Sequence, residues 1–130
     1  MQSQFKENIK LLAERSLTFD LCISESQYSA CYELITHCPD TIFVLDHCGR
    51  PQLAEHDFGA WRSSLQRLAE CPNVYCKLSG IIEQLSPQDD TLSKLAPHFD
   101  TCLDLFGVKR VLWGSDWPVC ELGGGLHNWL

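Results

Sequence analysis

The chain lacks the long apolar segments that a membrane protein needs. Its longest uninterrupted apolar run, Ile42 to Leu45, is far shorter than the roughly 20 apolar residues that span a bilayer. The first 15 residues carry charges at Lys6, Glu7 and Lys10, and they contain no apolar stretch of the signal-peptide type. We therefore expect a cytoplasmic protein that has no membrane partner.

The sequence also has little positive charge and no basic run. Asp and Glu total 17 against 10 for Lys and Arg, which gives a net charge of −7. Such a balance disfavours a nucleic-acid backbone as a partner, because phosphate binding requires clustered Lys and Arg. Neither Gly-x-Gly-x-x-Gly nor Gly-x-x-x-x-Gly-Lys-Ser/Thr occurs, so nucleotide binding has no support. The partner we expect is a small-molecule substrate.

Close cysteine pairs are absent too, although the chain contains 8 cysteines. No two of them are spaced Cys-x-x-Cys, the arrangement by which one turn supplies two thiolates to a structural zinc ion. A secreted disulfide framework also fits poorly, since 45% of the residues are hydrophobic and can build a core unaided. We expect most of the cysteines to be small buried residues of a reduced protein.

Apolar residues predict an alternation of helices and strands. Four short segments rich in β-branched and aromatic residues predict strands at Leu17–Ile23, Thr41–Asp46, Val74–Leu78 and Lys109–Trp113. A helix around residues 9–12 is expected before the first strand, and a helix over Tyr28–Cys38, capped by Ser24 or Ser26, before the second.

Two further helices are predicted between the later strands. Asp57 caps the first of these, whose buried stripe is Trp61, Leu65 and Leu68. The other ends at Gly107, and its apolar stripe consists of Leu92, Leu95, Phe99, Leu103 and Phe106. Residues 127–130 predict the first turn of one more helix.

This order of elements predicts an α/β fold with a parallel sheet. The strand starts lie 24, 33 and 35 residues apart, which is the repeat of a βα unit with right-handed crossovers. About four parallel strands with flanking helices form either a partial TIM (β/α) barrel, whose full size is about 250 residues, or a small doubly wound sheet. In either case residues 1–130 form one domain.

Polar residues follow three of the four predicted strands. They occur in the segments Asp46-His-Cys-Gly-Arg50, Lys77-Leu-Ser-Gly80 and Gly114-Ser-Asp-Trp-Pro118. Parallel strands present their carboxyl ends at one edge, so we expect a common mouth that holds His47, Lys77, Ser79, Asp116 and Trp117.

Simpler interpretations of the same residues remain open. Asp46 and His47 would then close a turn, Asp116 would be a turn residue, and Lys77 would extend out of a barrel wall to solvent. Asp20, in the middle of the first strand, is either a satisfied buried carboxylate or a residue of the mouth. The other histidines considered are expected to be solvated: His37, His56 and His98.

Three motifs together resemble the amidohydrolase-related (amidohydrolase 2) family of TIM-barrel metal-dependent hydrolases. They are Phe43-Val-Leu-Asp-His-Cys-Gly-Arg-Pro51, Asn73-Val-Tyr-Cys-Lys-Leu-Ser-Gly80 and Arg110-Val-Leu-Trp-Gly-Ser-Asp-Trp-Pro-Val119. Their order and spacing look most like the lactonase branch. The resemblance extends from Leu17 to about residue 130, and it implies strands five to eight of the barrel.

The resemblance also implies roles for particular residues. His47 and Asp116 would be the catalytic residues and the ligands of one divalent metal ion, zinc in the first place, although lactonases of this branch are also described as metal-independent. Asp116 would activate the attacking water. Lys77, Ser79 and Trp117 would line the substrate site.

The chain departs from the family in one large respect. The His-x-His pair of the family's first strand is absent, and strands one to four have no counterpart. Three functions are therefore open: a hydrolase of a lactone or related ester of a sugar acid or aromatic breakdown product, a decarboxylase of the same superfamily, and an incomplete half-barrel. The half-barrel would act only by association with a complementary half or a second copy.

Overall fold

A four-stranded parallel sheet forms the centre of the fold, as the computed structural model shows for residues 3–54, 57–86 and 88–129. The strands β1 (Thr18–Leu21), β2 (Ile42–Leu45), β3 (Val74–Leu78) and β4 (Val111–Trp113) are hydrogen-bonded in sequence order. Leu21 is in register with Leu45, which is in register with Cys76. The predicted α/β class and parallel strands are confirmed, with strands that are equal to or shorter than the predicted segments.

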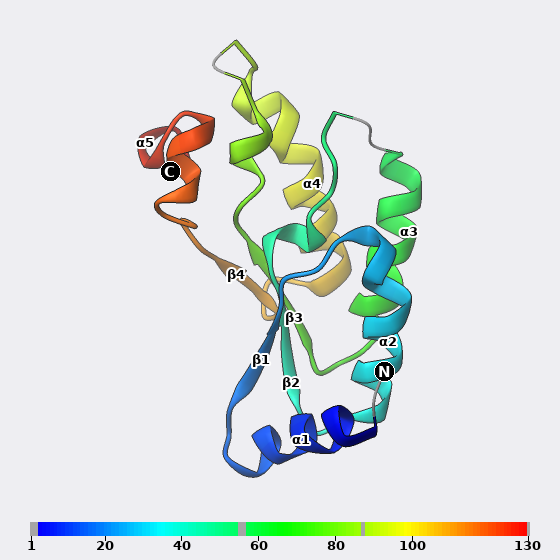
Figure 1. Cartoon of the computed structure of the whole chain (residues 1–130). Coiled ribbons are helices and arrows are strands. Elements are labelled where there is room, and N and C mark those ends of the chain that lie inside the picture. Colours follow the sequence, from blue (N-terminus) through cyan, green and yellow to red (C-terminus); the bar gives the residue numbers. More distant parts are fainter. Residues whose placement is uncertain (1–2, 55–56, 87, 130) are drawn as a thin grey trace.

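The helices lie on one face of this sheet and at its two ends. Figure 1 shows α2 (Tyr28–His37), α3 (Phe58–Ala69) and α4 (Thr91–Phe106) along one face, while α1 (Ser3–Glu14) crosses the base. The short helix α5 (Leu126–Trp129) lies near the carboxyl end of β4. Within the described ranges no helix is long and apolar enough to cross a membrane.

The core fills the space between the sheet and the three helices. Alternate strand residues such as Phe43, Leu45 and Cys76 point to the helices and are completely buried. On the helix side they meet a stripe that includes Trp61 and Leu65, as the helical spacing predicted. Burying each large apolar side chain contributes about 1.5–3 kcal/mol. Seven of the 8 cysteines are buried and all are free thiols, which confirms the interpretation of most cysteines as core residues.

Arg110 fixes the connection from α3 to β3 against β4. Its guanidinium donates hydrogen bonds to the carbonyl oxygens of Ala69 (2.9 Å), Cys71 (2.9 Å) and Val74 (3.0 Å). The last carbonyls of a helix have no partner within the helix, and a cation also suits the negative end of the helix dipole. This contact holds the amino ends of β3 and β4 together, so the register of the two strands is set there.

The second face of the sheet is uncovered by the part of the chain that the structure describes. Ile42 on β2 is exposed although Thr41 and Phe43 on either side of it are buried, and Leu112 on β4 is exposed as well. Parallel sheets are ordinarily covered on both faces, and in a closed barrel this face lines the interior. The arrangement is therefore that of one half of a barrel wall.

Three predictions about α4 are wrong. Leu103, which the sequence analysis places in the apolar stripe, is 37% exposed. Leu92 is 75% exposed because it lies in the first turn of α4, outside the stripe that faces the core. His98 is buried rather than solvated, since it lies on that stripe, and its ring contacts Phe58 and Trp61 at centroid distances of 5.2 and 5.1 Å.

Of the other local predictions, one is wrong and two are confirmed. Ser24 and Ser26 do not cap α2, because the short 3₁₀ turn η1 (Glu25–Gln27) intervenes and Ser24 precedes it. Gly107 ends α4 as predicted, with a φ of 69°. His37 is exposed as expected, whereas His56 lies outside the described residues.

The cap of α3 gives a test of the fold. Asp57 accepts a hydrogen bond from the backbone N–H of Ala60 at 3.0 Å. We expect Asp57→Ala to lower the free energy of unfolding by about 1 kcal/mol, because this N–H loses its partner. Urea denaturation followed by circular dichroism measures the change. The control Gln66→Ala, on the exposed side of the same helix, stays within about 0.5 kcal/mol of the wild type. Equal effects of both variants would contradict the role of the cap.

Candidate active site

The carboxyl ends of β2, β3 and β4 surround one hollow of about 370 Å³. Four of the five predicted site residues line it: His47, Lys77, Ser79 and Asp116. The fifth, Trp117, follows Asp116 in the chain, is 67% exposed and is not among the lining residues. The lining is completed by Asp46, Trp113 and Gly114.

The loop after β2 is held in an unusual backbone conformation. His47, Cys48 and Arg50 have φ values of 57°, 52° and 53°, in the left-handed region that side-chain-bearing residues rarely adopt. Such a conformation persists only where surrounding structure supports it. Here the Tyr28 hydroxyl donates to the carbonyl of Gly49, and the indole N–H of Trp61 donates to the carbonyl of Cys48 at 3.1 Å. Two helices therefore fix the loop that presents His47.

The imidazole of His47 is oriented from β3. Its Nδ1 is hydrogen-bonded to Ser79 Oγ at 2.8 Å, which leaves Nε2 to face other groups. Gly80, at a φ of 66°, lets the ring approach the backbone, because a Cβ there would lie 2.2 Å from His47 Nδ1. The Ser79-Gly80 pair thus positions the ring through one hydrogen bond and one close approach.

Lys77 joins three strands at the open face of the sheet. Its ammonium donates to Asp46 Oδ1 at 2.6 Å and to Asp20 Oδ2 at 3.2 Å. Partial burial opposes the charged form, but these hydrogen bonds and the two negative charges raise the pKa of Lys77. Asp20 is accordingly an ion-paired residue below the mouth, and Lys77 remains a cation at neutral pH.

Asp116 and its neighbours form the rim beyond β4. Asp116 has a φ of 53°, and the indole N–H of Trp129 donates to the carbonyl of Gly114 at 2.9 Å, which fixes the loop against α5. Trp129 in turn packs against Phe99 of α4 at 5.4 Å between ring centroids. The side chain of Asp116 therefore reaches the hollow from a supported loop.

Glu83 is a residue near this site that the sequence analysis missed. It lies in the 3₁₀ turn η3 (Ile82–Gln84), and its Oε2 is buried without a hydrogen-bond partner among the described residues. Burial raises the pKa of Glu83, and the charge of Asp116 adds to the effect, while a backbone hydrogen bond, His47 and Arg50 oppose it. The sequence contained one signal for Glu83, because this acidic residue directly follows two apolar residues, Ile81 and Ile82, which are both buried.

A further cluster adjoins the hollow at the end of β1. Cys22, Asp46 and His47 each offer one ligand atom, and these atoms all lie within 4.8 Å of one another. The sequence analysis assigned metal binding to His47 and Asp116 instead, and Asp116 is not part of this cluster. Thiolate, imidazole and carboxylate are all ligands of zinc, so the residues present suit a divalent ion.

These groups give the mouth a defined chemistry. Asp116 is a carboxylate that can accept a proton, His47 presents a ring nitrogen, and Lys77 is a fixed positive charge. An oriented base, a donor and a cation are the groups that activate water and stabilise negative charge on a carbonyl oxygen.

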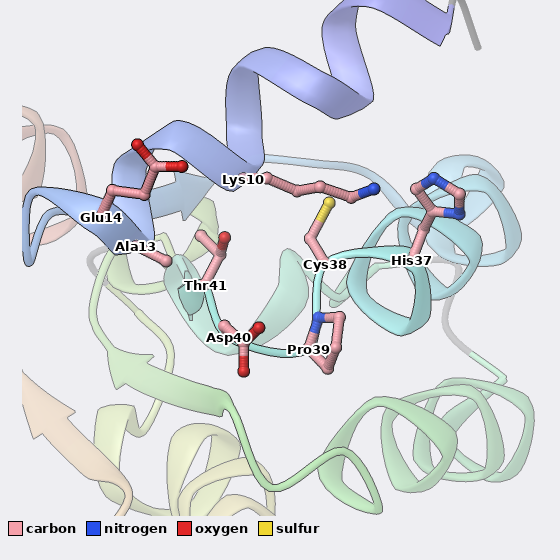
Figure 2. Close-up of a pocket in the computed structure, with 8 residues that line it drawn as sticks. All are labelled: Lys10, Ala13, Glu14, His37, Cys38, Pro39, Asp40 and Thr41. Atoms are coloured by element: carbon pink, nitrogen blue, oxygen red, sulfur yellow. The ribbon is translucent and has the colours of Figure 1, made fainter.

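A second hollow, larger than the mouth, lies at the other end of the sheet. It measures about 620 Å³ and is bounded by α1, the end of α2 and the turn before β2, as Figure 2 shows. Several lining groups hold the structure together: Thr41 Oγ1 donates to the carbonyl of Ile9, and His37 lies 3.9 Å from Glu7. Contacts of this kind at the amino ends of barrel strands serve stability, whereas barrel chemistry occurs at the carboxyl ends.

Three of the known proteins with similar sequences are named lactonases. The chain is 34% identical over 116 residues to the L-fucono-1,5-lactonase of Burkholderia ambifaria, covering 89% of this chain and 40% of that protein. It is 33% identical over 129 residues to the L-fucono-1,5-lactonase of Burkholderia multivorans, covering 92% and 44%. The L-rhamnono-gamma-lactonase of Scheffersomyces stipitis is 26% identical over 141 residues. The chain thus spans less than half the length of the lactonases it matches.

Solved structures agree on the fold. An amidohydrolase of Burkholderia multivorans with bound zinc superposes with a TM-score of 0.89 at 32% identity, covering 97% of this chain and 46% of that one. Amidohydrolase 2 of Bifidobacterium longum subsp. infantis gives a TM-score of 0.76 at 26% identity, covering 97% and 45%. The four strands therefore correspond to part of a TIM barrel, as predicted. The amidohydrolase family model matches residues 2–130, and the chain belongs to the amidohydrolase family.

Proposed function

We propose that this chain forms half of the active-site mouth of a hydrolase that opens the lactone ring of a sugar acid. The observation that carries the proposal is the convergence of His47, Lys77, Ser79 and Asp116 from three neighbouring strands on one hollow. The similarity to two L-fucono-1,5-lactonases and an L-rhamnono-gamma-lactonase supports this substrate class.

Asp116 and His47 have different roles in the proposed ester hydrolysis. Asp116 accepts a proton from the water that attacks the lactone carbonyl. His47, held by Ser79 at Nδ1, directs Nε2 at the carbonyl oxygen and polarises it through a hydrogen bond. When the ring opens, the proton passes to the departing ring oxygen, and a hydroxy acid results.

Lys77 and Trp117 contribute to substrate binding in this proposal. An ammonium has three N–H donors, and Asp46 and Asp20 accept two of them. The third is directed to a substrate oxygen, where the positive charge also favours the carboxylate of the product. Trp117, exposed beside Asp116, offers an aromatic face to the sugar ring.

A divalent ion fits this mouth as well. His47 and Asp116 are the ligands that the family resemblance assigns, and Cys22 and Asp46 place two more ligand atoms next to His47. Bound there, zinc would supply Lewis-acid polarisation of the carbonyl and a lower pKa for a bound water.

An association surface is a second proposal, favoured by the uncovered face of the sheet. Exposed apolar side chains on an open sheet, together with the outer edges of β1 and β4, favour contact with another chain. We propose that this face pairs with a complementary barrel half or a second copy, which completes the mouth.

The role of Asp116 is tested by Asp116→Asn in the assembled form of the enzyme. We expect kcat for lactone hydrolysis to fall about 10²–10⁴-fold, because an amide cannot accept the proton. Acid release from L-fuconate and L-rhamnonate lactones, followed with a pH indicator, measures the rate. Asp104→Asn, an exposed carboxylate on α4, is the control and keeps the wild-type rate. Release of carbon dioxide without ring opening would instead support the decarboxylase.

The close approach of His47 to Gly80 gives a second test. We expect Gly80→Ala to lower kcat about 100-fold, because the added Cβ displaces the imidazole from its position beside Ser79. Gly107→Ala is a matched control, since Gly107 also has a positive φ of 69° but nothing within 4 Å of an added Cβ. Both variants also lose about 1–3 kcal/mol of stability from backbone strain, because a side chain is unfavourable at a positive φ. Similar activities of the two variants would rule out the positioning role.

Association is tested by size-exclusion chromatography with in-line light scattering. We expect the 130-residue chain to form a dimer or larger species, and Leu112→Gln, on the open face, to shift it toward the monomer. Leu103→Gln is the control, because Leu103 has a similar exposure but lies on α4, behind the sheet. A monodisperse wild-type monomer would refute the association surface.

A further inference from the structure

The turns that follow β3 and β4 touch through their backbones. Gly123 ends the 3₁₀ turn η4 (Val119–Gly123), and the turn η3 lies directly against it. A Cβ on Gly123 would collide with the carbonyl oxygen of Ile82 and would lie 2.8 Å from the Cα of Glu83, closer than real Cβ atoms come to a backbone. Glycine at this position therefore allows the two turns their close separation.

The turn η4 is joined to Asp116 by a hydrogen bond. The backbone N–H of Cys120 donates to the carbonyl of Asp116 at 3.2 Å, and the side chain of Cys120 is buried in the core. Asp116 has a φ of 53°, which a residue with a side chain keeps only where its surroundings support it. The hydrogen bond from Trp129 to Gly114 gives this support on one side of Asp116, and η4 gives it on the other.

The turn η3 belongs to the segment that orients His47. It begins two residues after Gly80, against which the imidazole of His47 lies. Ile81 and Ile82 of this segment are completely buried, so the segment cannot shift without disturbing the core. The contact between the two turns therefore connects the segment that orients His47 with the loop that carries Asp116.

We propose that Gly123 is a positioning residue for lactone hydrolysis, because its contact with η3 fixes Asp116 relative to His47 in the mouth. This inference rests on the proposed function, in which Asp116 accepts a proton from water and His47 polarises the carbonyl. Both groups must meet one lactone carbonyl, and a misplacement of about 1 Å costs about 100-fold in rate. Gly123 has no side chain to offer the substrate and acts through Asp116.

Glu83 shows that the contact is maintained at a local cost. Its Oε2 is buried and has no hydrogen-bond partner within the described ranges, and leaving a buried polar atom unpaired costs free energy. Natural proteins accept such violations chiefly at functional sites. This oxygen belongs to one of the two residues that Gly123 meets, which supports a functional role for the contact in addition to packing.

Gly123→Ala in the assembled enzyme tests the proposal, with Gly59→Ala as the control. We expect kcat for L-fuconate lactone to fall about 100-fold in Gly123→Ala, because the added Cβ moves η4 and Asp116 away from η3. Gly59 also has no positive φ, and a Cβ there meets only the side chain of Asp57, at 3.3 Å, so Gly59→Ala keeps the wild-type rate. Thermal denaturation confirms that both variants are folded.

A double-mutant cycle separates positioning from a general loss of stability. Asp116→Asn has already lost the proton acceptor, so adding Gly123→Ala lowers the remaining rate less than about threefold, because residues that act as a unit are not additive. Equal effects of Gly123→Ala in both backgrounds, or a wild-type rate in Gly123→Ala, would overturn the proposal and leave lactone hydrolysis intact. A wild-type enzyme that does not hydrolyse lactones would instead refute the proposed function, and the role of Gly123 with it.

Nuclear magnetic resonance of the 130-residue chain tests the contact itself without an activity measurement. In the wild type we expect a nuclear Overhauser effect between the α protons of Gly123 and Glu83. We also expect Gly123→Ala to shift the backbone amide signal of Asp116, and Gly59→Ala to leave that signal in place. Absence of the Overhauser effect, or an unchanged Asp116 signal in folded Gly123→Ala, would overturn the proposal.

Discussion

Parallel pairing in sequence order determines the arrangement of the site. Because β1 to β4 all run in one direction, the residues that follow each strand meet at a single edge, although they are up to about 90 positions apart in the chain. The same pairing sends one set of side chains to the helices and the other to the open face. Lys77, Asp20 and Asp46 come from three adjacent strands and form their ion pairs only because the register holds them at one level.

Support for the mouth comes from residues well below it. The strained loop at His47 is held by Tyr28 and Trp61, which reach it from α2 and α3, and the loop at Asp116 is held by Trp129. These aromatic side chains bury their rings in the core and use one polar atom each on a loop carbonyl. Core packing and the geometry of the mouth are therefore coupled, so changes in the core alter the position of the polar groups.

Most of the sheet and four of the five site residues could be predicted from the sequence, for a physical reason. Strand ends in a parallel fold share one edge, so His47, Lys77, Ser79 and Asp116 converge whatever their separation in the chain. Other features depend on contacts that local patterns do not contain. His98 is buried because of the position at which α4 begins. The turn η3 buries the carboxylate oxygen of Glu83. Cys22 lies close to His47 because of the register of β1 and β2 and the positive φ of His47.

The four tryptophans of the chain are divided between two environments. Trp61 and Trp129 are buried, while Trp113, which lines the hollow, and Trp117 are exposed. Indole emission shifts to longer wavelength in water, so the fluorescence spectrum of this chain is a sum of a core component and a rim component. Acrylamide quenches the rim component selectively. The rim component of the fluorescence therefore reports binding at the mouth, and the core component separately reports unfolding of the core.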